Sequence, residues 1–166
     1  PLRGTAPSMT IEENLALAYT RKASRSFFAV NRQDNAYFRD LLATLGMGLE
    51  DRMKIKMGLL SGGQRQAASL LMATVAQPKL LLLDEHTAAL DPGAAEKVME
   101  ITGQIVARDK ITTLMITHDM DYALSMGSRT IMLDSGKIVL DLSGPERQAM
   151  TAGALAERFY TRSTKR

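Results

Sequence analysis

Two short segments constrain the fold of this chain most: a glycine-rich helix start, and a run of leucines that ends in two acids. The first reads Leu60-Ser61-Gly62-Gly63-Gln64-Arg65-Gln66, and the second reads Leu80-Leu81-Leu82-Leu83-Asp84-Glu85. Ser61 can cap a helix whose glycines let the backbone approach an anion at the positive end of the helix dipole. Four successive leucines are typical of a strand covered on both faces, as in parallel sheets. A helix followed by a buried strand therefore predicts an α/β fold.

The first 60 residues contain helical patterns and no convincing strand. Thr10 and Glu13 form a capping-box pattern at the start of a helix predicted over residues 10–19. A second helix is predicted over residues 36–45, where two nearby glycines end it. We therefore expect residues 1–60 to form a helical subdomain.

From residue 62 onward, helical segments alternate with short strands. Strands are predicted over residues 79–84, 111–117, 129–134 and 137–141. Helices are predicted over residues 63–76, 92–108, 119–126, 145–150 and 152–160. Ser135-Gly136 between the last two strands is typical of a two-residue hairpin turn. This alternation predicts an α/β layer with at least some parallel pairing.

We expect three regions along the chain. The last helix of the helical subdomain continues through residues 61–77. Residues 78–143 then form an α/β core, and residues 144–166 form C-terminal helices and a tail. A chain of 166 residues with 45% hydrophobic content is long enough to bury a core.

Composition excludes several classes of protein. The chain has no cysteine, which removes disulfides and thiolate metal sites, and its longest aliphatic run is too short to insert in a membrane. Aromatic residues are only 5%, which disfavours nucleic-acid binding by base stacking.

The net charge of +3 arises in the first 60 residues. We interpret it as a solvated basic face, and contact with lipid headgroups or with an acidic partner is the alternative. The basic residues concerned are Arg21, Lys22, Arg25 and Arg32.

The two acids at the end of the leucine strand suggest chemistry with a bound cation. Ligands in parallel α/β sheets bind beyond the carboxyl ends of the strands. Asp84 could hold Mg²⁺, directly or through water, because hard cations prefer oxygen ligands. Glu85 could orient an attacking water or accept its proton. The alternative is two surface acids after a core strand.

Four segments together resemble ABC-type ATPases. Residues 60–66 are similar to the family's signature motif, and the strand that ends at Asp84 is similar to its Walker B strand. Ala89-Leu90-Asp91-Pro92 resembles the D-loop, and His118 lies where the family has its switch histidine. Most members have proline where this chain has His86, which we interpret as a variation and not as a ligand.

The resemblance extends over essentially the whole chain and is to the ATP-binding subunit of a bacterial ABC transporter. It implies a partial P-loop NTPase fold: a helical subdomain plus the C-terminal part of a mostly parallel sheet with flanking helices. The pattern is most similar to uptake systems for amino-acid-like solutes, some assigned to tryptophan or tyrosine. The implied role is hydrolysis of ATP, with Mg²⁺, to power solute import from the cytoplasmic face of the inner membrane. The implied partners are a membrane permease and a second ATPase subunit, as a homodimer.

The resemblance also implies a role for each site residue. Each ATP lies between two subunits, and the residues that bind the partner's nucleotide are Ser61, Gly62, Gly63 and Gln64. Asp84 holds the metal, while Glu85 and His118 act on the nucleotide bound to the same subunit. Asp91 contacts the partner subunit across the interface.

One element of the family's machinery does not occur in the sequence. No G-x-x-x-x-G-K-[ST] phosphate loop is present, and this loop supplies most of the contacts to the β- and γ-phosphates. We expect the chain to be N-terminally truncated relative to the family, and the isolated chain to hydrolyse no ATP. We also expect an unprotected position beside the strand over residues 79–84, which favours aggregation.

Two other classes of function stay open. A non-transport ABC ATPase of DNA repair or translation is one, although no sustained heptad run is present. A non-enzymatic half-domain that binds a partner's nucleotide is the other. Glu85 and His118 argue against it, since a pure regulator gains nothing from them.

Overall fold

The computed structural model describes residues 4–23 and 32–163, and the chain divides into two compact units. The first unit is Pro1–Leu114 and the second is Met115–Arg166. The side chains of the four basic residues that dominate the charge surplus lie outside the described part.

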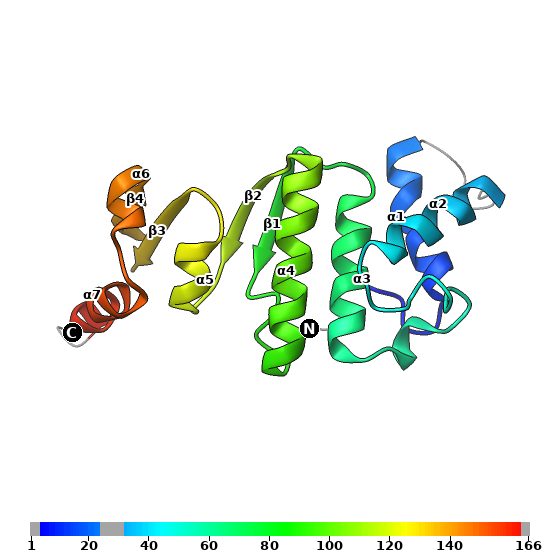
Figure 1. Ribbon diagram of the computed structural model, residues 1–166, viewed down its shortest axis with the longest axis horizontal. Helices are drawn as coiled ribbons and strands as arrows, with labels where there is room; N and C mark the ends of the chain where they lie inside the picture. The colour runs from blue at the N-terminus through cyan, green and yellow to red at the C-terminus, as the bar shows by residue number, and fades with distance from the viewer. Residues whose placement is uncertain (1–3, 24–31, 164–166) are drawn as a thin grey trace. The chain divides into compact units, whose positions relative to one another are not determined.

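Among its described residues, the first unit contains four α-helices, strand β1 and the first part of strand β2 (Figure 1). Its elements are α1 (Ile11–Ala23), α2 (Arg32–Ala43), a single 3-10 turn (Met57–Leu59), α3 (Gly62–Thr74), β1 (Leu80–Asp84), α4 (Pro92–Asp109) and β2 (Thr112–Ile116). The boundary between the two units falls within β2. The predicted helices and strands of this region are confirmed, with ends that differ by a few residues.

The start of α1 is the predicted capping box. The Thr10 amide donates to Glu13 Oε2 at 2.7 Å, and the Glu13 amide donates to Thr10 Oγ1 at 3.2 Å. The hydrogen bond from the Thr10 backbone holds the pKa of Glu13 below its ordinary value of 4.5. The ionised carboxylate is thus favoured at the positive end of the helix.

Asn14 fastens the segment before α1 to the helix. Its side chain is fully buried, and its Oδ1 accepts from the Ala6 amide at 2.7 Å. Its Nδ2 donates to the carbonyl oxygens of Ala6 at 3.0 Å, Thr10 at 2.9 Å and Met9 at 3.4 Å. A buried amide with its donors and acceptor satisfied stabilises the fold, whereas an unpaired one would cost free energy.

The core of the helical part lies between α1, α2 and α3. Ile11, Leu15, Phe38 and Leu42 are fully buried, and Tyr19 packs edge-on against Phe38 with ring centroids 5.5 Å apart. Ile11 and Leu15, which are four positions apart and so share one face of α1, are buried in this helical core.

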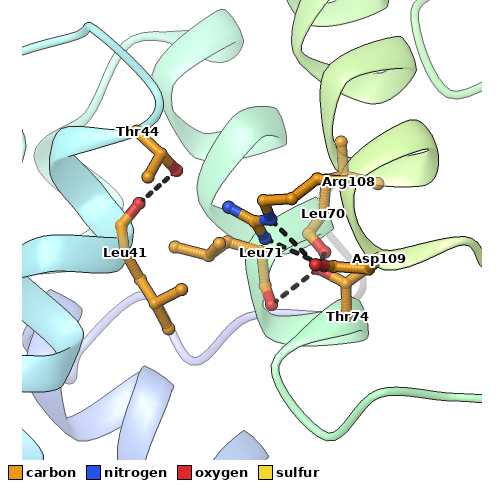
Figure 2. Close-up of polar contacts among 7 residues, drawn as sticks. All are labelled: Leu41, Thr44, Leu70, Leu71, Thr74, Arg108 and Asp109. Atoms are coloured by element: carbon orange, nitrogen blue, oxygen red, sulfur yellow. Dashed lines mark hydrogen bonds and ion pairs between the residues drawn. The ribbon is translucent and has the colours of Figure 1, made fainter.

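Helices α3 and α4 lie side by side next to the sheet (Figure 1). At the C-terminal end of α3, the buried Thr74 hydroxyl donates to the carbonyl oxygens of Leu70 at 3.0 Å and Leu71 at 3.2 Å. Figure 2 shows these contacts and also Arg108 at the end of α4, whose guanidinium pairs with both oxygens of Asp109 at 2.8 Å. Polar groups at the ends of both helices are thus satisfied locally.

Strands β1 and β2 pair with each other and run in the same direction (Figure 1). Leu81 and Leu83 of β1 are buried, whereas Leu80 is 52% exposed and Leu82 is 64% exposed. The prediction of a strand covered on both faces is therefore wrong for the described chain. Successive side chains of a strand point to opposite faces, and only one face of β1 is packed here.

The second unit begins at the end of β2 and is built on a hairpin. Its elements are α5 (Met120–Ser125), β3 (Arg129–Asp134), β4 (Lys137–Ser143), α6 (Gly144–Gln148) and α7 (Ala152–Ser163). The strands are antiparallel, and the predicted turn is confirmed, with positive φ at Ser135 (51°) and Gly136 (75°). Met132, Leu142 and Leu155 form a small core to which α5 also contributes.

Replacement of Glu13 by glutamine tests the capping box of α1. The lowered pKa means that the carboxylate stabilises the fold above the unfolded-state pKa, and that this contribution is lost as the pH falls through the folded-state pKa. We expect Glu13→Gln to lower the melting temperature at neutral pH and to lower it less below pH 4.5. Thermal melts followed by circular dichroism check this. An equal deficit at both pH values would contradict it.

Candidate functional site

A capping box between Ser61 and Gln64 stabilises the N-terminus of α3. The Gln64 amide donates to Ser61 Oγ at 3.3 Å, and the Ser61 amide donates to Gln64 Oε1 at 3.3 Å. Gln64 Nε2 also lies 3.5 Å from the carbonyl oxygen of Met47. Ser61 was expected to cap this helix, and it does. The role of Gln64 in the cap was not predicted, although the S-x-x-Q spacing is its signal.

The two glycines at this helix start are in close contact with the D-loop and α4. A Cβ on Gly63 would lie 3.0 Å from Ala94 Cβ, and a Cβ on Gly62 would lie 3.2 Å from Leu90 Cδ2. Gly63 is buried, whereas Ser61 and Gly62 are exposed. These glycines therefore let two helix N-termini approach each other and leave exposed amides at the surface, where an anion is favoured.

Asp91 caps α4. Its Oδ1 accepts from the Ala94 amide at 3.0 Å, and Pro92 follows at the first position of the helix. The predicted helix start at Pro92 is confirmed. Because Ala94 also touches Gly63, the cap of α4 and the start of α3 form one unit of structure.

The two carboxylates lie at the C-terminal end of β1. Asp84 is the last residue of the strand, and both Asp84 and Glu85 are exposed. Glu85 has a φ of 43°, which places its backbone in the left-handed region. A residue other than glycine in this region is strained and persists only where its surroundings hold it. The strand end therefore turns sharply at Glu85.

A cavity of about 530 Å³ lies at this turn, wholly within the first unit. It brings Asp84 and Glu85 together with the start of α3 and with residues that precede α1. The lining residues are Gly4, Thr5, Gly62, Arg65, Gln66, Ser69, Asp84, Glu85, His86, Ala88, Ala89 and Leu90. A hollow with two carboxylates, hydroxyls and a guanidinium suits a polar, charged ligand.

Two groups in the cavity wall are buried without a hydrogen-bond partner. These are Thr5 Oγ1 and Arg65 Nε. The other end of the Arg65 guanidinium is used, because Nη2 donates to the Leu60 carbonyl at 3.1 Å. Unsatisfied buried donors are costly and are expected to meet a partner, such as an oxygen-rich ligand.

His86 is half-buried and lines the same cavity. Its Nε2 lies 3.1 Å from Thr102 Oγ1 on α4, and burial lowers the pKa of the imidazole. No local sequence pattern predicts this pairing, because the two residues are sixteen positions apart.

His118 belongs to the second unit. It is exposed and follows β2 by two residues, so the strand ends slightly earlier than predicted. Next to it, Asp119 caps α5 by accepting from the Tyr122 amide at 3.0 Å.

The donor set at the strand end is small. In the described part of the chain, no three histidine, cysteine, aspartate or glutamate side chains come together in a group that could hold a metal ion. Mg²⁺ is commonly bound by one or two carboxylates, with waters and substrate phosphates as its other ligands. An exposed Asp84 at the edge of the cavity fits that mode of binding.

Comparison with known proteins gives consistent matches. Residues 3–88 match the ABC transporter family. A tyrosine transport ATP-binding protein of Clostridioides difficile is 44% identical over 159 residues, which cover 96% of this chain and 63% of that protein. A phosphonates import ATP-binding protein of a Nostoc species is 32% identical over 148 residues, covering 88% of this chain and 60% of that protein.

Solved structures agree with these matches. A dimeric ATP-binding cassette in a post-hydrolysis state, bound to ADP and Pi, is 27% identical with a TM-score of 0.68. The match covers 84% of this chain and 58% of that one. This chain therefore belongs to the ABC transporter family, and its fold is that of part of an ABC cassette. It spans 63% and 60% of the length of the two relatives above.

Substitution of Gly63 by alanine tests the contact between α3 and α4. The added Cβ would press on Ala94 Cβ, and overpacking of this kind destabilises by about 1–3 kcal/mol. We expect Gly63→Ala to lower the free energy of unfolding in urea by an amount in this range. Ala94→Gly in the same chain should recover much of the loss, because it removes the atom that is pressed.

Gly93→Ala is the matched control. Its Cβ would meet only Asp91 Oδ1, at an ordinary 3.7 Å, so the free energy of unfolding should be unchanged or rise by up to about 1 kcal/mol. Equal effects of Gly63→Ala and Gly93→Ala would show that the close approach of the helices is not what requires glycine.

Proposed function

We propose that this chain is the signature and Walker B part of an ATP-hydrolysing subunit that powers solute uptake through a membrane permease. The observation that carries the proposal is the cavity at the end of β1, which joins Asp84 and Glu85 to the glycine-rich start of α3. The match to the ABC transporter family supports it, as do relatives that are named import and transport ATP-binding proteins.

In this proposal, Glu85 acts on the water that attacks the γ-phosphate. Its carboxylate lies at the cavity, where it can orient the water and accept its proton. His118, which belongs to the second unit, is proposed to contact a nucleotide phosphate and to help place an attacking water. Catalysis of phosphoryl transfer depends mainly on such positioning and on stabilisation of charge.

Asp84 would hold Mg²⁺ through a carboxylate oxygen, directly or through water. When bound, the cation would neutralise charge on the phosphates. The strand that ends at Asp84 fixes the backbone of this ligand, and the exposure of its side chain leaves room for waters in the coordination shell.

The signature segment is proposed to serve a second copy of the subunit. Ser61, Gly62 and Gly63 present a capped helix N-terminus, which favours a phosphate, and Gln64 lies beside it for the ribose. Asp91 would contact the partner near the same place. The dimeric form of the similar cassette supports a homodimer for this chain.

The proposed setting is the cytoplasmic face of the plasma membrane, with the subunit bound peripherally to a permease. Across residues 4–23 and 32–163, none of the helices has the length and apolar character to span a bilayer. The 44% identity to a tyrosine transport ATP-binding protein favours an amino-acid-like solute.

Glu85→Gln tests the proposed function. The assay uses the whole protein that the gene encodes, and not the isolated 166-residue chain. Loss of a general base lowers kcat by about 10²–10⁴-fold. We expect ATP hydrolysis to fall by that factor while ATP binding, measured by equilibrium dialysis, is retained, because the amide keeps the shape of the carboxylate.

Glu96→Gln is the matched control, since Glu96 is an exposed acid on α4 that does not line the cavity. This variant should hydrolyse ATP at the rate of the unsubstituted protein. Equal rates for Glu85→Gln and the unsubstituted protein would overturn the assignment of Glu85.

A further inference from the structure

His86 joins the turn that follows the catalytic strand to a fully packed helix. Its Nε2 lies 3.1 Å from the hydroxyl of Thr102, which is 1% exposed in the middle of α4. The Thr102 hydroxyl in turn lies 2.7 Å from the Val98 carbonyl oxygen on the same helix. The carboxylate end of β1 is therefore connected to the α4 backbone through a chain of two hydrogen bonds.

The direction of these bonds follows from the chemistry of the hydroxyl. A threonine hydroxyl has one hydrogen, and a carbonyl oxygen can only accept. The Thr102 hydroxyl donates its hydrogen to the Val98 carbonyl, so the hydroxyl oxygen accepts a hydrogen bond from the imidazole of His86. His86 must therefore carry a hydrogen on Nε2, which determines how the ring is held.

The turn beside His86 is strained at Glu85. Glu85 has a φ of 43°, a conformation that must be held by its surroundings. The Ala88 amide donates to the Glu85 carbonyl at 3.0 Å, which closes the turn on one side. The His86–Thr102 bond holds the turn from the other side, on α4.

We propose that His86 is a positioning residue for the reaction, which holds the left-handed backbone of Glu85 and thereby the direction of its carboxylate. The inference rests on the proposed function for its consequence in catalysis, and on the geometry of the turn for everything else. Helix α4 also touches the signature segment, through Ala94 and Gly63. The same helix thus supports both the carboxylates and the phosphate-binding helix start.

The first test needs no activity. In the NMR spectrum, the His86 Nε2–H should give a protected imidazole proton that persists in Thr102→Ser and disappears in Thr102→Val. The Ala88 amide should exchange with solvent about fivefold faster in Thr102→Val and His86→Leu, since a hydrogen bond of ordinary strength is lost. His86→Gln can still donate from its amide nitrogen and should exchange at the original rate. Equal Ala88 exchange in all five proteins would overturn the proposal.

The second test measures ATP hydrolysis by the whole protein that the gene encodes. We expect kcat to fall by about tenfold to a hundredfold in His86→Leu and Thr102→Val, with the KM for ATP nearly unchanged. His86→Gln and Thr102→Ser should keep most of the rate. A lower melting temperature with an unchanged kcat would mean that the bond is only structural, and would overturn the positioning role.

The two tests separate the two claims. If the unsubstituted protein hydrolyses no ATP, the proposed function fails while the Ala88 exchange still decides whether His86 holds the turn. If it hydrolyses ATP and all four variants match it, the function stands and the role of His86 is overturned.

Discussion

The close approach of α3 and α4 at their N-termini is the constraint on which the rest of the site depends. A Cβ on Gly63 would lie only 3.0 Å from Ala94 Cβ, so the two helices can meet in this way only where a side chain is lacking. The contact places the capped start of α3 beside the D-loop and the cap of α4. Glycine is required here by packing, because a side chain at position 63 would press on α4.

Helix α4 is a common support for groups that come from different parts of the chain. Its first turn is capped by Asp91 and touches the signature segment, and its middle holds Thr102 against His86. The turn that carries Glu85 and the glycine-rich start of α3 are therefore both attached to one long helix. Such support on a rigid element favours a constant distance between the two groups.

Local patterns predicted local structure well. The capping box of Thr10 and Glu13, the helix start at Pro92 and the hairpin turn at Ser135-Gly136 each depend on residues a few positions apart. The prediction for β1 was wrong because four leucines describe a strand that can be covered on both faces, and only one face is packed in the described chain. The His86–Thr102 bond was not predictable, because it depends on how a turn meets the middle of a helix.

The central claim is that each copy of the chain serves two different nucleotide sites, with its Glu85 in one site and its Ser61 in the other. Hydrolysis by mixed dimers, purified through a different affinity tag on each copy, tests it directly. A dimer with Glu85→Gln in one copy and Ser61→Arg in the other should keep one intact site and hydrolyse ATP. A dimer with both substitutions in one copy and an unsubstituted second copy should hydrolyse none. The reverse result, with activity only in the second dimer, would show that each site lies within a single chain and would contradict the account.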